Sequence, residues 1–212
     1  RSNSGEGRDT ECELCSLGRY AMDRGLVFCV ACPGGYYGDE VGQREPCKYC
    51  VKGKYQNRLA EQSCIVCDVG MHQDEIQQPQ CKECLPGKWV DTVQQEVCKK
   101  CPKNWYTDST KQVRCNKCQI GLLTRDMGGK PIDGSNLCVS CLQGQFWIRG
   151  QVGEIEKCQA CPGGYFSRPG NKTACLPCLT GTYSELEKLS TKCLNCKRGK
   201  WSGALNASND EV

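Results

Sequence analysis

The sequence predicts a small disulfide-rich tandem repeat, an elongated rod of short β-ribbons and loops with almost no helix and no single core. Three observations predict it. The chain has 22 cysteines in 212 residues, a density typical of secreted disulfide scaffolds. Every cysteine belongs to a Cys-x-x-Cys pair, and most pairs recur every 17 or 18 residues. The remaining apolar residues, with only 15 aromatics, are too few to offset the chain entropy of one large core.

The eleven pairs mark the repeats. They begin at Cys12, Cys29, Cys47, Cys64, Cys81, Cys98, Cys115, Cys138, Cys158, Cys175 and Cys193. We expect a lead-in over residues 1–11, ten to eleven modules over 12–196, and the start of a next module or a tail over 197–212. The modules at 118–138 and 141–158 are longer than the others. Their extra residues, including Met127–Gly134 and the glycines Gly150 and Gly153, predict surface loops that could carry contacts.

A second pattern follows each pair at a fixed distance. The third residue after the second cysteine, here the glycine position, is glycine in ten modules and Asn104 in one. Asparagine is the non-glycine residue that best tolerates positive φ, so we expect a turn with a left-handed residue. Two residues further on, the ring position usually holds an aromatic residue, with His72 and Leu123 as exceptions. We expect each ring to pack on a disulfide.

Three segments, Cys32–Tyr37, Cys161–Phe166 and Cys178–Tyr183, share the pattern Cys-x-x-Gly-x-aromatic. With the paired cysteines, this pattern resembles the ephrin-receptor-like cysteine-rich repeat, which is similar to the first half-module of tumour-necrosis-factor-receptor cysteine-rich domains. The resemblance covers residues 12 to about 201. Repeats of this type occur in receptors, secreted matrix proteins and surface proteins of protists.

The resemblance implies a disulfide connectivity that spacing alone cannot fix. The second cysteine of one pair would bond the first cysteine of the next. The implied disulfides are Cys15–Cys29, Cys32–Cys47, Cys50–Cys64, Cys67–Cys81, Cys84–Cys98, Cys101–Cys115, Cys118–Cys138, Cys141–Cys158, Cys161–Cys175 and Cys178–Cys193. Cys12 and Cys196 stay unpaired under this scheme, so we expect the 212 residues to be a segment of a longer protein.

Other chemistries explain the cysteines less well. Paired Cys-x-x-Cys motifs also bind zinc, but eleven pairs cannot all be shared two to a site, and the glycine and ring positions recur once per pair. A thioredoxin-like site needs its motif at a helix start in a βαβ unit. A His-dependent catalytic constellation would need His72, which occupies a ring position. We therefore expect no enzyme, no metal site and no cofactor.

Net charge, apolar run length and glycosylation sequons bear on where the chain acts. The net charge is +4, and the two densest basic clusters, at Lys99, Lys100 and Lys103 and at Lys197, Arg198 and Lys200, are too small for a nucleic-acid interface. No apolar run is long enough to span a membrane, so any membrane attachment lies in parts not in this chain. Asn171 and Asn206 begin glycosylation sequons. We expect an extracellular or cell-surface location.

Two functions fit this organisation. The first is mechanical: an extracellular structural rod serving as a spacer, stalk or filament subunit in a matrix, cell coat or flagellar hair, with other proteins or its own copies as partners. Tyr36, Trp105 and Trp147 are candidates for contacts between rods, although local packing explains them as well. The alternative is a ligand-binding receptor ectodomain or a protist surface antigen, which the two longer modules favour.

Overall fold

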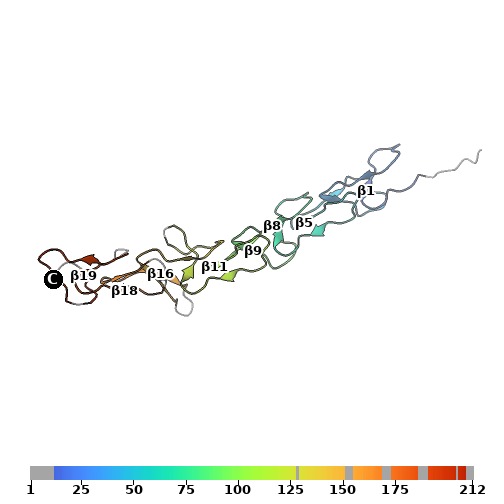
Figure 1. Ribbon diagram of the computed structural model, residues 1–212. Coiled ribbons are helices and arrows are strands. Elements are labelled where there is room, and N and C mark those ends of the chain that lie inside the picture. Colours follow the sequence, from blue (N-terminus) through green and yellow to red (C-terminus); the bar gives the residue numbers. More distant parts are fainter. Residues whose placement is uncertain are drawn as a thin grey trace, which may run out of the picture. The chain divides into compact units, whose positions relative to one another are not determined.

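The computed structural model describes residues 12–127, 129–150, 155–168, 173–185, 191–203 and 205–208. These residues fall into two compact units. The first unit spans Arg1–Glu83 and Thr92–Val97, and the second spans Cys84–Asp91 and Cys98–Val212. Over the described ranges there is no helix, and the regular structure consists of short strands joined by loops (Figure 1). Consequently no described helix could cross a membrane. The predicted absence of a single core is confirmed, and the described strands form no closed sheet.

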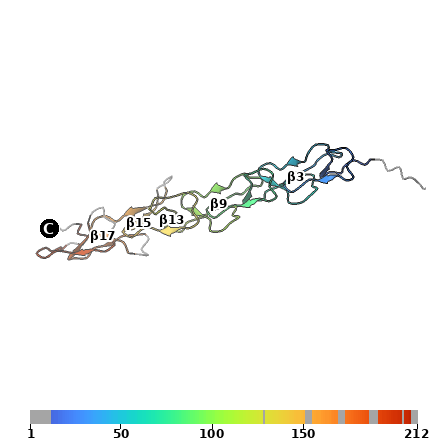
Figure 2. The same ribbon diagram turned by 90° about the horizontal axis from the view of Figure 1, so that it is seen from above.

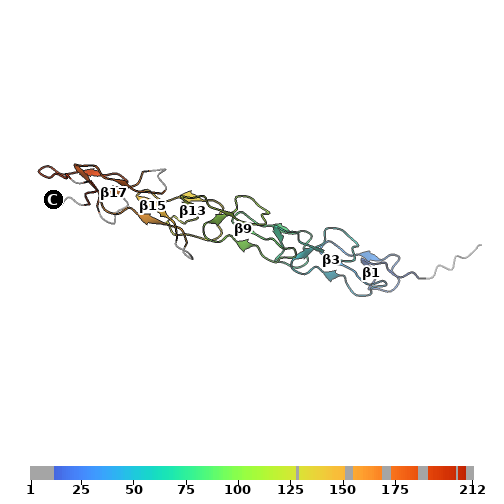
Figure 3. The same ribbon diagram turned by 90° about the horizontal axis from the view of Figure 1, so that it is seen from below.

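The strands pair antiparallel, each with a neighbour in the chain, into ten two-stranded hairpins. The first unit contains β1 (Arg19–Tyr20), β2 (Val30–Ala31), β3 (Tyr36–Tyr37), β4 (Lys48–Tyr49), β5 (Lys54–Tyr55), β6 (Ile65–Val66), β7 (Met71–His72) and β8 (Lys82–Glu83). The second unit contains β9 (Lys88–Trp89), β10 (Lys99–Lys100), β11 (Trp105–Tyr106), β12 (Asn116–Lys117), β13 (Leu122–Leu123), β14 (Val139–Ser140), β15 (Gln145–Ile148), β16 (Lys157–Ala160), β17 (Tyr165–Phe166), β18 (Leu176–Pro177), β19 (Thr182–Tyr183) and β20 (Leu194–Asn195). Within the second unit, the strands β9, β13, β15 and β17 follow one another in space in the same order as in the sequence (Figures 2 and 3).

The cysteine spacing explains why the strands are so short. The first strand of each hairpin ends at the ring position, and the second strand is the pair of residues inside the next Cys-x-x-Cys. In one hairpin, Tyr36 pairs with Tyr49 and Tyr37 pairs with Lys48. Because a cysteine flanks this second strand on each side, pairing usually stops after two residues. The exception is β15–β16, where four residues of each strand pair and Cys158 itself lies in the ladder opposite Trp147.

Each hairpin is closed by a disulfide between the second cysteine of one pair and the first cysteine of the next. The structure contains ten such bonds, between the same residues that the family resemblance implies. Their Cα atoms lie 5.6–5.8 Å apart, which is ordinary for a disulfide. Cys12 and Cys196 have no disulfide partner within this chain.

The glycine position forms the left-handed turn that the sequence predicts. Gly35 has a φ of 81°, and Asn104, its counterpart in another module, has a φ of 65°. The Gly35 amide donates to the carbonyl of Gln56 at 2.7 Å, and its own carbonyl accepts from the Cys50 amide at 2.8 Å. A Cβ atom on Gly35 would lie 2.2 Å from the carbonyl oxygen of Gln77. Glycine is therefore needed both for the turn and for the close approach of a later loop.

Hydrogen bonds between loops link successive modules within each unit. In the first unit, the Gln77 amide donates to the Cys50 carbonyl at 2.9 Å, and the Gln94 amide donates to the Cys67 carbonyl at 2.8 Å. Both donors have positive φ, 62° and 60° respectively. Each of these bonds joins the start of one disulfide loop to the far side of the following loop. The disulfide loops are therefore interlocked within a unit and do not fold as isolated beads.

The buried interior consists mainly of sulfur and of one residue per module that the sequence analysis did not single out, with the ring-position residues Leu123 and Tyr183 buried as well. The second cysteine is buried in nine modules, at Cys15, Cys32, Cys50, Cys67, Cys84, Cys101, Cys118, Cys161 and Cys178. The residue directly after the ring position, here called the cover position, is buried in eight, at Gly38, Gln56, Gln73, Val90, Thr107, Thr124, Ser167 and Ser184. The rings themselves are mostly half-exposed.

The cover residues lie against the disulfides. A Cβ atom on Gly38 would lie 3.2 Å from Cys32 Sγ, and Thr107 Oγ1 lies 4.0 Å from Cys101 Sγ. Where the cover residue is glutamine, its amide also satisfies buried backbone groups. Gln73 donates to the Gln80 carbonyl at 2.6 Å and accepts from the Glu75 amide at 3.1 Å. Gly38 and Thr107 therefore lie against a sulfur, and Gln73 braces its own loop.

The glycine position can be tested by separating backbone strain from steric clash. Gly87 and Gly181 both have positive φ, but a Cβ on Gly87 would lie 2.1 Å from the Gly134 carbonyl oxygen, whereas one on Gly181 would meet nothing within 4 Å. We expect Gly181→Ala to cost about 1–2 kcal/mol, the strain of a left-handed alanine. Gly87→Ala should cost clearly more. Hydrogen exchange of the amides in each module, with disulfides intact, measures both costs, and equal costs would contradict the close approach.

The cover position can be tested at Gln73, which is 1% exposed. Gln73→Ala leaves the Gln80 carbonyl and the Glu75 amide without their partner, so we expect a local loss of about 1–3 kcal/mol. Gln80→Ala is the control, because this side chain is exposed and its backbone carbonyl is unchanged. Hydrogen exchange over residues 67–81 should accelerate only in the first variant. Equal acceleration in both variants would mean that the buried amide does not brace the loop.

Candidate interaction surface in the second unit

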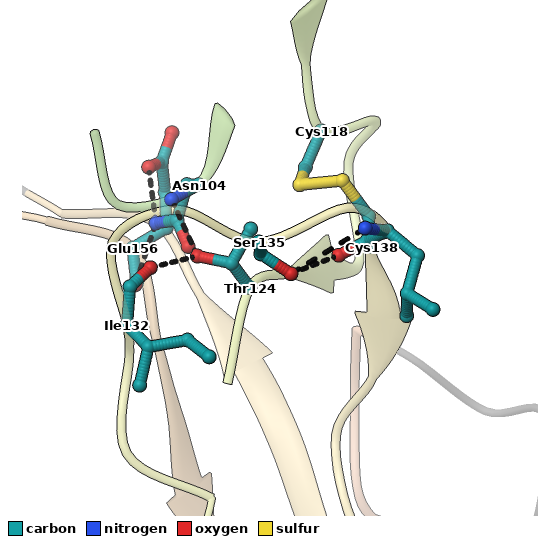
Figure 4. Close-up of a disulfide and its surroundings, with 8 residues drawn as sticks. Asn104, Cys118, Thr124, Ile132, Ser135, Cys138 and Glu156 are labelled. Atoms are coloured by element: carbon teal, nitrogen blue, oxygen red, sulfur yellow. Dashed lines mark hydrogen bonds between the residues drawn. A yellow bond between two sulfur atoms is a disulfide. The ribbon is translucent and has the colours of Figure 1, made fainter. Parts of the chain in front are cut away.

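Three departures from the repeat meet in the second unit. They are the asparagine at the glycine position, the longer module 118–138 and the longer module 141–158. Asn104 contacts Thr124, which is bonded to the first longer module's loop, and Glu156, which lies in the second (Figure 4). These irregularities are far apart in the sequence, so their meeting marks this surface as different from the regular modules.

Asn104 uses both its backbone and its side chain in this cluster. Its backbone amide donates to Thr124 Oγ1 at 2.9 Å, as the Gly87 amide does to Thr107 Oγ1. Thr124 Oγ1 in turn donates to the Ile132 carbonyl at 2.7 Å. Asn104 Nδ2 donates to the backbone carbonyl and to Oε2 of Glu156, both at 3.0 Å. The side chain therefore fills the space that a close carbonyl occupies at Gly35 or Gly87.

The first longer module folds into an ordered turn. Arg125 and Pro131 form an isolated antiparallel bridge, the Asp126 amide donates to the Lys130 carbonyl at 3.0 Å, and Asp126 Oδ1 accepts from the Lys130 amide at 2.8 Å. Met127 is 99% exposed. In the part of this predicted surface loop that the structure describes, Met127 is presented to solvent and residues 129–134 follow the turn.

The second longer module contributes a longer hairpin and an ion pair. Glu156, next to β16, lies 3.1 Å from Lys117 Nζ. Burial alone would raise the pKa of Glu156, but hydrogen bonds from Lys117 and Asn104 hold that pKa below its ordinary value. A lowered carboxyl pKa means that the contact stabilises the fold above the ordinary glutamate pKa and is lost as pH falls through the lowered value. The ion pair is therefore formed at neutral pH.

A groove of about 530 Å³ lies beside these contacts. Its lining includes Asn104, Lys117, Ile120, Trp147, Arg149 and Glu156. Lys117 is paired with Glu156, while Arg149 makes no ion pair with any residue that the structure describes. A guanidinium near an indole and an aliphatic side chain suits a ligand that carries an anionic group beside an apolar face.

Of the other residues singled out from the sequence, Tyr36, Trp105 and Asn206 do not line this groove. Tyr36 is half-buried in β3 and Trp105 is 38% exposed in β11. Trp147 alone of the three candidate contact rings lines the groove. Asn206 has a φ of 68° and its amide donates to the Cys178 carbonyl, so this sequon lies at an inter-loop bond. Asn171 lies outside the described residues, and occupancy of both sequons remains a prediction.

The structure identifies residues that sequence reasoning missed. Nothing in the sequence pairs Glu156 with Asn104, since 52 residues separate them. Aligning the modules on their cysteines would have shown that the residue at the cover position is small, hydroxylated or an amide in most of them and tryptophan in one.

The zinc alternative requires thiolates, and the twenty cysteines joined in disulfides offer none.

Comparison with known proteins supports the repeat type. Residues 87–133 match the family model described as tyrosine-protein kinase ephrin type A/B receptor-like. No curated protein matches the chain. The matched segment contains Asn104 and residues 118–133 of the first longer module, and the same cysteine, glycine and ring positions recur through the other modules. Residues 87–133 are therefore similar to the ephrin-receptor-like repeat, and the rest of the chain repeats the same cysteine pattern.

Proposed function

We propose that this chain is an extracellular structural protein that serves as a poorly extensible spacer, stalk or filament subunit. The observation that carries the proposal is the unbroken series of disulfides from Cys15 to Cys193. Ten disulfides of this kind are stable in the oxidising extracellular space and rare in the cytosol, and the ephrin-receptor-like repeat type supports the same location. The proposed partners are other proteins, including further copies of the chain.

The disulfides limit how far the chain can be stretched. Tension applied between Cys15 and Cys193 runs through ten disulfides, each spanning 5.6–5.8 Å between Cα atoms, and through nine three-residue junctions. At about 3.4 Å per extended residue, this path cannot exceed roughly 150 Å. The reduced chain could extend to roughly 600 Å over the same residues. This ceiling follows from covalent connectivity alone and needs no particular arrangement of the two units.

Hydrogen bonds between successive loops support the same role below the ceiling. The bonds from Gln77 and Gln94 to the Cys50 and Cys67 carbonyls must break before the loops of the first unit can separate. Equivalent bonds occur in the second unit, from Lys111 to the Cys84 carbonyl and from Gly134 to the Cys101 carbonyl. A chain built this way resists small extensions through the hydrogen bonds between its loops. It resists large extensions through the covalent path that its disulfides form.

The groove in the second unit favours a second candidate function, that of a ligand-binding receptor ectodomain or surface antigen. The groove collects the Arg149 guanidinium, the Trp147 ring and Ile120 in one place. Such a site would capture a soluble acidic ligand and leave the repeats as its scaffold.

Pulling on single molecules tests the mechanical proposal. Handles attached next to residues 15 and 193 should give a maximum extension of roughly 150 Å under non-reducing conditions and roughly 600 Å after complete reduction. A protein with a different connectivity or with open disulfides would exceed the first value. Extension beyond about 200 Å without added reductant would rule out an inextensible spacer, because only junction residues can lengthen while the ten disulfides hold.

Binding measurements and microscopy separate the two functions. Calorimetry with a glucuronate-bearing disaccharide probes the groove, and a receptor function predicts binding that Arg149→Ala abolishes. Lys130→Ala, which removes an exposed cation in the first longer module, is the matched control. Electron microscopy of the native material discriminates the two functions independently. An ordered polymer supports the spacer or filament, and separate molecules that retain a bound ligand support the receptor.

A further inference from the structure

The disulfide Cys141–Cys158 differs from the other nine in its exposure. In each of those nine, the second cysteine of the pair is buried, with exposures from 0% to 9%, and only its partner is half-buried. In Cys141–Cys158 both cysteines are half-buried. Of the ten disulfides that the structure describes, this is the one with no buried member.

Module 141–158 also differs from most of the others at its cover position. In the eight modules with a buried cover residue, that residue is glycine, glutamine, valine, threonine or serine. In module 141–158 the cover position holds Trp147, which is half-buried and belongs to the four-residue strand β15. An indole is too large to fit where Gly38 or Thr107 lies against a sulfur. Trp147 lines the groove and lies opposite Cys158 in the ladder, and Cys141 is half-buried.

We propose that Cys141–Cys158 is a site of thiol–disulfide exchange with external thiols, and that it opens while the other nine disulfides stay closed. A thiolate of an external dithiol attacks one sulfur of the bond, forms a mixed disulfide and releases the other sulfur as a thiolate. The second thiol of the reagent then displaces the protein sulfur. The dithiol becomes a disulfide, and both cysteines become thiols after protonation. Access of the attacking thiolate to sulfur controls this rate when the reagent is the same.

Loop length is the competing explanation for faster exchange at Cys141–Cys158. A second disulfide of the chain, Cys118–Cys138, distinguishes the effect of loop length from that of exposure. Cys118–Cys138 closes a longer loop than Cys141–Cys158, with sequence separations of 20 and 17 residues, but Cys118 is buried. If exposure governs exchange, Cys141–Cys158 reacts first. If loop length or insertion alone governs it, Cys118–Cys138 reacts at least as fast.

The test is partial reduction of the full chain. Cys12 and Cys196 are first blocked with N-ethylmaleimide so that they cannot initiate exchange. The protein is then treated with dithiothreitol at neutral pH for increasing times, quenched with acid, alkylated with a second label and mapped by peptide mass spectrometry. We expect Cys141 and Cys158 to acquire the second label at least tenfold faster than Cys101 and Cys115. Faster labelling of any other pair, or uniform labelling of all ten, would overturn the proposal.

Substitution of the cover residue tests the cause. Trp147→Ser introduces the residue found at the cover positions Ser167 and Ser184, and we expect it to slow exchange at Cys141–Cys158 severalfold. Trp105→Ser is the control, because Trp105 is exposed in β11 and lies outside the cover position. An unchanged rate in Trp147→Ser would show that the tryptophan does not expose the bond. If that variant is misfolded, the order of labelling in the wild-type chain still decides the proposal.

Discussion

The closure of each loop by a disulfide from a second cysteine to the next first cysteine is the constraint on which the rest of the structure depends. Closing a loop of about 15 residues contributes roughly 3 kcal/mol in the chain-entropy model. The buried interior is little more than one sulfur and one cover residue per module, far less than a core that could offset the entropy of 212 residues. Without the disulfides, two-residue strands such as β3 and β4 would not persist, since short isolated hairpins are marginal in water.

The disulfides and the left-handed turn at the glycine position depend on each other. The turn at Gly35 orients its amide toward one loop and its carbonyl toward the Cys50 amide, so the residue after the turn enters a strand opposite the next cysteine pair. At Asn104 the same backbone geometry persists with a side chain present. The second longer module makes this possible. Its Glu156 presents a backbone carbonyl and a carboxylate to the side-chain amide of Asn104, whereas at Gly35 and Gly87 a loop carbonyl lies against the glycine.

Much of the fold could be predicted because the repeat encodes it locally. The spacing of the cysteine pairs, the glycine at a fixed offset and the left-handed exception at Asn104 follow from the sequence, and the family resemblance supplied the pairing. The interlocking of the loops did not follow, because the bond from Gln77 to the Cys50 carbonyl uses backbone groups that every residue type carries. The surface around Glu156 could not be predicted either, since its partner Asn104 lies 52 residues away and no periodic signal connects them.

Both candidate functions depend on the same irregular module. Trp147, Arg149 and Glu156 all lie in the loop that Cys141–Cys158 closes, so opening this bond would free the residues that line the groove. The same opening would release the 17 steps of chain between the two cysteines and raise the covalent ceiling by roughly 50 Å. A chain whose other disulfides stay closed would thus lengthen by one defined step without losing its remaining modules. The half-buried disulfide Cys141–Cys158 therefore connects the thiol chemistry proposed for the chain to its mechanical limit.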